Sequence, residues 1–322
     1  MKILLTTGSF QDTPGRHHEL LSRQGYDITA KKGPLTEDEL LPVIAQYDAM
    51  LCGDDEITAA VLQKGKEGVL KYISKYGVGY DKIDVVKAKE LNIPVTFCPG
   101  VNQVSVAEHV FALLLTFMKN IHLEYNITKT GGWEKYTGHE VAGKTIGIMG
   151  FGAIGKEVAK RAHAFGMNVI IATSHPDVKY ITESGYAVAE NFSKLAAQAD
   201  VISLHVPLTK QTEELINEEL ISNVVKKGVI IINTARGRLV NAAAIKKGIE
   251  QNIIAGYLTD VLDIEPMPEN YLLKNLPNVL ITPHIGSRTY ESVERQGLRS
   301  VENLINMLSG NLAAYKDYLI WT

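Results

Sequence analysis

Three residues whose side chains can move a proton or bind an anion lie near the ends of successive predicted strands. They are Arg236, Glu265 and His284. Histidine titrates closest to neutral pH, so it can donate or accept a proton at a substrate oxygen. A neighbouring carboxylate favours and orients the charged imidazole, and an arginine offers a planar fork to a substrate carboxylate. These three residue types suit reversible hydride transfer at the carbonyl carbon of an organic acid.

Nearby carboxylates leave two assignments open. Asp263 competes with Glu265 for the place beside His284 on sequence spacing alone. Asp260 either meets the amide of a bound nicotinamide or caps the end of its own strand. Any one of the nine histidines, taken singly, is more often structural than catalytic. It is the combination of Arg236, Glu265 and His284 that favours catalysis.

A glycine-rich turn supplies the matching cofactor site. Gly150, Gly152 and Gly155 form the pattern G-x-G-x-x-G, with Ala153 and Ile154 inside it, between a predicted strand and a helical segment. The first glycine permits a tight bend, the second lets the backbone approach a pyrophosphate, and the third lets the helix pack closely. The helix amino end then faces the anion. The pattern predicts a dinucleotide cofactor, NAD or NADP.

The residues after the next strand favour NADP. A dinucleotide site usually has Asp or Glu there to bind the adenosine ribose, whereas this chain has Thr173, Ser174 and His175. The hydroxyls of Thr173 and Ser174 can donate hydrogen bonds to a 2'-phosphate, which a carboxylate would repel. His175 or Lys179 can add positive charge. The alternative is that Thr173 only ends a strand and NAD binds with fewer contacts.

The elements that must position these residues alternate between short apolar strands and longer amphipathic helices, among them 36–47 and 84–91. This order predicts an α/β fold of two Rossmann-like or flavodoxin-like doubly wound parallel sheets. The expected strands are 2–5, 27–30, 49–52, 71–75 and 93–97, then 145–149, 168–172, 200–204, 229–232, 253–258 and 279–282. Because the carboxyl ends of parallel strands face the ligand crevice, the candidate loops should converge.

The two series of strands indicate two domains. The breaker pair Pro99-Gly100 precedes a long apolar helix that begins around Ser105, and the amphipathic segment 289–308 has no strand after it. We therefore expect a substrate domain of 1–98 plus 289–322, in which the last segment crosses back. The NAD(P)-binding Rossmann domain would be 99–288, with the active site in the cleft between the domains.

Composition excludes several classes of protein. In 322 residues, 33 Lys and Arg stand against 36 Asp and Glu, which argues against a dedicated nucleic-acid or membrane-surface protein. Only Cys52 and Cys98 are present, so a reducing, cytoplasmic location is expected, and we assign no metal site. The apolar stretch 104–118 contains polar residues and is predicted to be a buried helix rather than a membrane span.

Seven short motifs resemble those of the D-isomer-specific 2-hydroxyacid dehydrogenases, the family of phosphoglycerate, hydroxypyruvate and glyoxylate-type enzymes. They are KYGVGYD at 75–81, GFGAIG at 150–155, HVPLT at 205–209, NTARG at 233–237, LTD at 258–260, EPMP at 265–268 and PHIG at 283–286. The resemblance implies that a D-2-hydroxy acid and its 2-oxo acid are interconverted. His284 would be the acid/base, Glu265 its partner, and Arg236 the substrate-binding arginine.

The same resemblance implies further contacts. Substrate would meet Lys75, Tyr76, Val78 and Gly79, with the backbone of Val78 and Gly79 at its carboxylate. Cofactor contacts beyond the glycine turn and Thr173, Ser174 and His175 would be His205, Val206, Pro207, Thr212, Thr234, Ala235, Arg236, Asp260, His284 and Gly286. A homodimer through region 105–139 is implied, although the aromatic loop 131–136 could equally cover the edge of a core.

Charges in the first domain point two ways on the substrate. Asp54, Asp55 and Glu56 follow a strand on the expected crevice side and would disfavour a second anionic group, whereas Lys75 would favour one. Phosphoglycerate therefore stays open, as do other small 2-hydroxy acids. Fold does not settle function, so the rival is a nucleotide-sensing binding protein similar to the C-terminal-binding corepressors.

Overall fold

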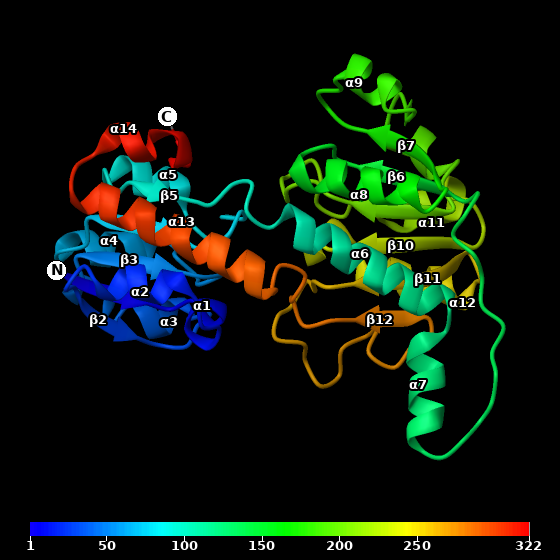
Figure 1. Ribbon diagram of the computed structural model, residues 1–322, viewed down its shortest axis with the longest axis horizontal. Coiled ribbons are helices and arrows are strands. Elements are labelled where there is room, and N and C mark those ends of the chain that lie inside the picture. The colour runs from blue at the N-terminus through cyan, green and yellow to red at the C-terminus, as the bar shows by residue number, and fades with distance from the viewer. Residues whose placement is uncertain (322) are drawn as a thin grey trace. The chain divides into compact units, whose positions relative to one another are not determined.

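The computed structural model describes residues 1–321, which form two α/β units (Figure 1). Unit 1 comprises Met1–Asn102 and the segment from Arg288 onward, and unit 2 comprises Gln103–Ser287. The expected boundaries, after residues 98 and 288, lie close to these positions. Each unit contains one parallel sheet covered by helices, which confirms the predicted fold class.

The sheet of unit 1 contains β1 (Lys2–Leu5), β2 (Asp27–Ala30), β3 (Ala49–Cys52), β4 (Tyr72–Lys75) and β5 (Val95–Thr96). They pair in parallel in the order β2-β1-β3-β4-β5. Successive side chains point to opposite faces of a strand. Ile3 and Leu5 of β1 accordingly pack in one buried cluster, whereas Leu4 packs in another on the opposite face.

Two layers of helices cover these faces. The cluster around Ile3 includes side chains from α1 (Gly8–Asp12), α2 (Arg16–Ser22) and α13 (Tyr290–Leu308), so the predicted segment 289–308 does return to the first unit. The cluster around Leu4 includes side chains from α3 (Glu37–Leu40), η1 (Ile44–Gln46), α4 (Ala59–Glu67) and α5 (Val85–Glu90). The chain ends with α14 (Leu312–Tyr315) and η3 (Lys316–Tyr318).

One helix prediction in this unit is wrong. The segment 36–47 was expected to form a single helix, but it divides into α3 and η1 around Pro42. Proline lacks the backbone N–H that an interior helical position donates, and its ring disfavours helical geometry in the residue before it. Thr36 still starts α3 with a reciprocal capping box to Glu39, as its sequence pattern favours.

The sheet of unit 2 has the order β12-β11-β10-β9-β6-β7-β8, and all its strands are parallel. Its members are β6 (Thr145–Met149), β7 (Asn168–Ala172), β8 (Ala187–Val188), β9 (Val201–Leu204), β10 (Val229–Asn233), β11 (Ile254–Thr259) and β12 (Val279–Ile281). The strand order reverses between β6 and β9, which places the expected dinucleotide crevice there. The two-residue strand β8 was not predicted, because so short a strand leaves no periodic signal.

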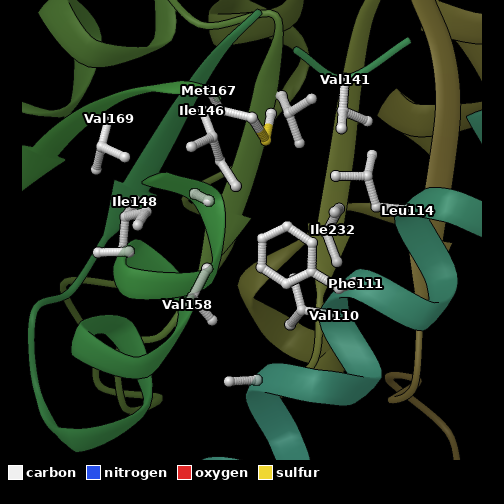
Figure 2. Close-up of a cluster of buried hydrophobic side chains, with 14 of the residues drawn as sticks. Val110, Phe111, Leu114, Val141, Ile146, Ile148, Val158, Met167, Val169 and Ile232 are labelled. Carbon is white, nitrogen blue, oxygen red and sulfur yellow. The ribbon is translucent and has the colours of Figure 1, made fainter. Parts of the chain in front are cut away.

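Helices cover both faces of this sheet as well. One core joins α6 (Gln103–Met118), α8 (Ala153–Ala164) and Ile181 of α9 (Val178–Glu183) to the strands. Figure 2 shows Val110 and Phe111 of α6 facing Ile148 and Val158 in this core. The opposite core includes α10 (Phe192–Ala196), α11 (Glu218–Asn223), η2 (Gly237–Leu239) and α12 (Ala242–Glu250). The predicted buried helix at 104–118 is thus confirmed.

A projection extends from unit 2. Helix α7 (Ile121–Lys129) leaves the body of the unit, and a long irregular segment returns from it to β6 (Figure 1). Trp133 in that segment is 80% exposed, so within this chain the loop 131–136 does not cover a core edge. Within residues 1–321, no single helix is long and apolar enough to cross a membrane. Helices α6 and α7 reach that length and apolar character only when taken together, and they are bent by 66° relative to each other.

Candidate functional site

The carboxyl edge of the unit 2 sheet gathers the predicted site residues. Gly150 follows β6, Thr173 follows β7, His205 follows β9, Asp260 follows β11, and His284 lies beyond β12. All these strands are parallel, so their following loops lie at one edge. Residues separated by more than a hundred positions in sequence are thereby brought to the same edge of one sheet.

The glycine turn has the geometry that its pattern predicts. Gly150 has φ +94, and a Cβ there would stand only 2.4 Å from the carbonyl oxygen of His205. A Cβ on Gly155 would lie 2.2 Å from the carbonyl oxygen of Gly150, so this glycine permits close contact between α8 and its strand. A Cβ on Gly152 would instead meet no atom of residues 1–321 within 4 Å. The turn is therefore closed on the protein side and open where a ligand would approach.

Two further observations fit a bound dinucleotide. Gly152 is the N-cap residue of α8 and has no side chain to cap the first N–H groups of the helix. Such groups are a site for phosphate. The hydroxyl of Thr234, a predicted cofactor contact, is buried and finds no hydrogen-bond partner in residues 1–321. A buried hydroxyl that makes no hydrogen bond costs free energy, so a hydrogen bond between this hydroxyl and a bound ligand would be favourable.

The loop after β9 is held internally. Nε2 of His205 lies 2.8 Å from the hydroxyl of Ser203, and burial lowers the pKa of His205 to about 3. His205 is therefore neutral under ordinary conditions. The Thr212 hydroxyl donates to the carbonyl of Pro207 at 2.7 Å and accepts from the N–H of Thr209 at 2.8 Å, so it shapes this loop itself. Val206 packs partly buried against a core, and the cofactor contacts of this loop stay predictions.

His284 and Glu265 meet directly. Nδ1 of His284 lies 2.8 Å from Oε2 of Glu265, and the side chains are 37% and 32% exposed. The other carboxylate oxygen of Glu265 accepts the backbone N–H of Leu262 at 2.8 Å, which fixes the carboxylate in place. With Nδ1 donating to Glu265, Nε2 is the ring atom that can exchange a proton with a substrate.

Asp263 has a different partner. Its Oδ1 accepts the hydroxyl of Tyr271 at 2.8 Å, and burial together with this aspartate raises the pKa of Tyr271. The open choice between Asp263 and Glu265 is thus resolved in favour of Glu265. The two carboxylates are near each other in sequence but turn to different neighbours.

Asp260 binds the loop that carries His284. Its Oδ1 accepts from the Thr282 hydroxyl at 2.6 Å and from the N–H of Ile285 at 2.9 Å, and its Oδ2 accepts from the N–H of Gly286 at 2.7 Å. It is only 2% exposed. Burial alone would raise the pKa of Asp260, but its hydrogen bonds outweigh burial and lower it. The structure supports the strand-end role for Asp260, and a contact with nicotinamide stays a prediction.

His109 completes this network and was missed in the sequence. Its Nε2 lies 2.9 Å from the Thr282 hydroxyl and 3.4 Å from Oδ1 of Asp260. This links α6 to the segment that carries His284, although 173 positions separate the two contacting residues. The available signal was a histidine in a largely apolar helix, which by itself does not identify a partner.

Arg236 lies in a short turn built by Asn233. The Asn233 side chain donates to the carbonyl of Arg236 at 2.8 Å and accepts the N–H of Ala235 at 3.1 Å. Nη1 of Arg236 donates to the carbonyl of Ala235 at 2.8 Å. Asn233, which the sequence analysis did not select, therefore sets the backbone from which this guanidinium projects.

The residues after β7 lie at the carboxyl edge of the sheet, where the cofactor is expected, and differ in exposure. Thr173 is half-buried, and Ser174 and His175 are exposed, with the Ser174 hydroxyl 2.9 Å from Nδ1 of His175. Nζ of Lys179, the other cation considered for the phosphate, lies 3.9 Å from Oε1 of Glu183. The first three residues thus offer polar groups to solvent where an adenosine ribose is expected.

In unit 1 the predicted substrate residues divide into two groups. Lys75 and Tyr76 are buried, and Tyr76 packs in the core with Phe10, which raises its pKa to about 12 through burial. Val78 and Gly79 lie in the more exposed part of the same loop. Among residues 1–321, no three His, Cys, Asp or Glu side chains are grouped to hold a metal ion.

Comparison with known proteins agrees with this geometry. The family model described as "D-isomer specific 2-hydroxyacid dehydrogenase, NAD binding domain" matches residues 111–286. The chain is 38% identical over 294 residues to a hydroxypyruvate reductase of Thermotoga maritima, covering 90% of this chain and 93% of that relative. It is 37% identical over 299 residues to a glyoxylate reductase of Thermofilum pendens, covering 88% and 85%.

Solved structures give the same result for the fold. A D-lactate dehydrogenase from Aquifex aeolicus, complexed with NAD and lactic acid, is similar with a TM-score of 0.85 and 30% identity over 99% of both chains. An acyclic imino acid reductase in complex with NADPH and D-Arg has a TM-score of 0.85 and 29% identity over 100% of both chains. Both similarities extend through the two units.

Proposed function

This chain belongs to the D-isomer specific 2-hydroxyacid dehydrogenases, and we propose that it interconverts a small D-2-hydroxy acid and its 2-oxo acid. The observation that carries the proposal is the contact of 2.8 Å between Nδ1 of His284 and Oε2 of Glu265. It lies at the sheet edge that also carries the open glycine turn. A nicotinamide cofactor supplies or accepts the hydride when bound.

The side chains divide the remaining work. In the reductive direction His284 protonates the carbonyl oxygen through Nε2, while Glu265 stabilises the imidazolium from the other side of the ring. Arg236 binds the substrate carboxylate through its planar guanidinium and thereby orients the carbonyl. Asp260, Thr282 and His109 hold the backbone from which His284 projects. The D configuration of the product follows from the family.

The test is a turnover assay of the purified chain. Glyoxylate, hydroxypyruvate, pyruvate and a phosphorylated 2-oxo acid are each supplied with NADH and with NADPH, and oxidation of the cofactor is followed by its absorbance. We expect reduction of at least one acid, with consumption of one cofactor per product formed. Binding of cofactor without reduction of any acid in the panel would contradict the proposal.

We propose NADP as the preferred cofactor and a second copy of this chain as the partner. The preference for NADP is supported by Thr173, Ser174 and His175 in place of a ribose-binding carboxylate. The dimer is supported by region 105–139, where every residue of α7 stays at least partly exposed. Tyr125 and Trp133 there are 59% and 80% exposed. Exposed aromatic side chains grouped on one projection are typical of subunit contacts.

Sedimentation velocity checks the dimer. We expect the wild type to sediment as a dimer and the double variant Tyr125→Ser, Trp133→Ser to sediment as a monomer, because large apolar contacts would be lost. Tyr290→Ser is the matched control, since Tyr290 is 74% exposed on α13 outside the proposed interface. A monomeric wild type, or a control that also dissociates, would contradict the assignment.

Replacement of Glu265 by glutamine should move the pH profile of the reduction to lower pH. The variant keeps the shape of the side chain but removes a negative charge beside His284. Protonation of the imidazole then becomes less favourable, so a lower pH is needed to load it with the proton it donates. The matched control is Asp263→Asn, which removes a charge that contacts Tyr271. An equal displacement of the profile in both variants would remove the special role of Glu265.

A further inference from the structure

Four charged residues of unit 1 have opposing implications for the charge of the substrate, and the structure shows that they have different contacts. They are Asp54, Asp55, Glu56 and Lys75. Asp55 faces inward and is 0% exposed. Its carboxylate accepts the Thr6 hydroxyl at 2.6 Å, the N–H of Leu35 at 2.7 Å and the N–H of Gly53 at 2.9 Å. Asp55 therefore joins the loops that follow β1, β2 and β3, and its charge is held by those donors inside the unit.

Glu56 is directed elsewhere. Its Oε2 accepts the backbone N–H of Glu37, the first residue of α3, at 3.2 Å. A carboxylate at the amino end of a helix is a structural contact of modest strength. This leaves Asp54 as the carboxylate of the group that faces Lys75.

Asp54 and Lys75 form an ion pair with unequal exposure. Nζ of Lys75 lies 3.0 Å from Oδ1 of Asp54, and the two side chains are 5% and 48% exposed. The same ammonium donates to the carbonyl of Tyr76 at 2.8 Å, and a Cβ on Gly77 would lie 3.4 Å from it. The buried ammonium of Lys75 thus stabilises the loop 76–79 through the Tyr76 carbonyl, while the carboxylate of Asp54 is partly exposed.

The topology of unit 1 predicts a ligand site beside this pair. In a doubly wound sheet of order β2-β1-β3-β4-β5, the order reverses between β1 and β3, and ligands bind outside the carboxyl ends of the strands at that point. Asp54 follows β3 there. The next strand, β4, leads directly into the loop of Val78 and Gly79.

We infer that Asp54 is a specificity-determining residue that makes this chain select 2-oxo acids with an uncharged distal group over phosphorylated ones. The inference rests on the proposed function and refines its substrate class. The charge of Lys75 is already compensated by Asp54, so a phosphate receives no uncompensated cation from this pair. A phosphate dianion would instead lie near a partly exposed carboxylate, where like charges repel. A neutral hydroxymethyl group or hydrogen meets no such penalty.

The test compares two substrates that differ only in the phosphate. The kcat/KM of the holoenzyme is measured with hydroxypyruvate and with 3-phosphohydroxypyruvate, for the wild type and for Asp54→Asn. We expect the wild type to prefer hydroxypyruvate by tenfold or more, and the ratio to move toward the phosphorylated acid by about tenfold in Asp54→Asn, because the negative charge that repels the phosphate is then removed. Asp54→Glu retains the charge and should restore the preference of the wild type.

Glu56→Gln is the matched control, because it removes one negative charge from the neighbouring position without touching Lys75. An equal change in Glu56→Gln would show a general effect of net charge and overturn the inference. A wild type that uses both acids equally well, or an Asp54→Asn ratio within twofold of the wild type, would overturn it as well.

Binding without turnover separates this inference from the proposed function. Isothermal titration calorimetry measures the affinity of the protein saturated with NADPH, which cannot accept a hydride, for D-glycerate and for 3-phospho-D-glycerate, and the same movement of the ratio toward the phosphorylated acid is expected in Asp54→Asn. If the wild type reduces no acid of the panel that tests the proposed function, that function is wrong, and calorimetry alone decides the role of Asp54. If it reduces hydroxypyruvate but Asp54→Asn changes neither ratio, the proposed function stands and the role of Asp54 is wrong.

Discussion

Replacing His284 with alanine is expected to lower kcat by about a hundredfold to ten-thousandfold, the usual contribution of a general acid/base group. Cofactor affinity should change little, because the glycine turn after β6 does not involve the His284 side chain. Stopped-flow or steady-state assays give kcat, and fluorescence titration with NADPH gives the affinity. Turnover within fivefold of the wild type would remove His284 from the mechanism.

The backbone at this position makes a second variant necessary. His284 has φ 54, in the left-handed region that asparagine tolerates better than alanine. His284→Asn therefore keeps the backbone preference and removes the proton relay, and it should lose as much activity as His284→Ala. His163→Ala, on the exposed side of α8, is the matched control and should retain the activity of the wild type. If His284→Asn kept the activity of the wild type, the loss of activity in His284→Ala would be due to backbone strain and not to the missing proton relay.

Introducing a carboxylate at position 173 should reverse the choice of cofactor. We expect the wild type to use NADPH at least as well as NADH, and Thr173→Asp to lower kcat/KM for NADPH relative to NADH by about tenfold or more. That change corresponds to roughly 1.4 kcal/mol. Only NADPH carries the 2'-phosphate that an aspartate after β7 would repel, whereas the ribose hydroxyls of NADH gain an acceptor.

The measurement is the ratio of the two efficiencies at one pH and one ionic strength. Ser193→Asp places the same charge at an exposed position of α10 and should leave the ratio unchanged. A wild type that prefers NADH by tenfold or more would show that Thr173, Ser174 and His175 make no productive contact with a phosphate. NAD would then be the cofactor of this chain.

Most of the fold could be predicted from the sequence because each unit relies on short, buried, parallel strands. Strands such as β6 and β7 are mostly apolar and are followed by glycine or a polar residue, and their predicted and observed limits coincide. The glycine pattern was equally legible, since tight backbone approach excludes other residues at Gly150 and Gly155. Strand ends also predicted which loops would share an edge, because parallel strands place their carboxyl ends together.

The directions of individual side chains were decided only in three dimensions. Asp263 and Glu265 are interchangeable by spacing, but Tyr271 takes the first and His284 the second. Asp54 and Asp55 are adjacent in sequence, yet one pairs with Lys75 and the other is buried among loop donors. Lys75 lies at the end of β4, whereas Tyr271, His284 and Thr6 lie in loops, so each partner becomes a neighbour only through the folding of the chain.

The contact between His109 and Thr282 likewise joins residues that are far apart in the sequence and become neighbours only in the folded chain. Sequence pattern determines which residues become strands, helices and tight turns, because those depend on local periodicity and backbone freedom. Which carboxylate is buried, paired or presented to a ligand depends on donors and charges supplied across the sheet. Those donors come together only when the strands are side by side.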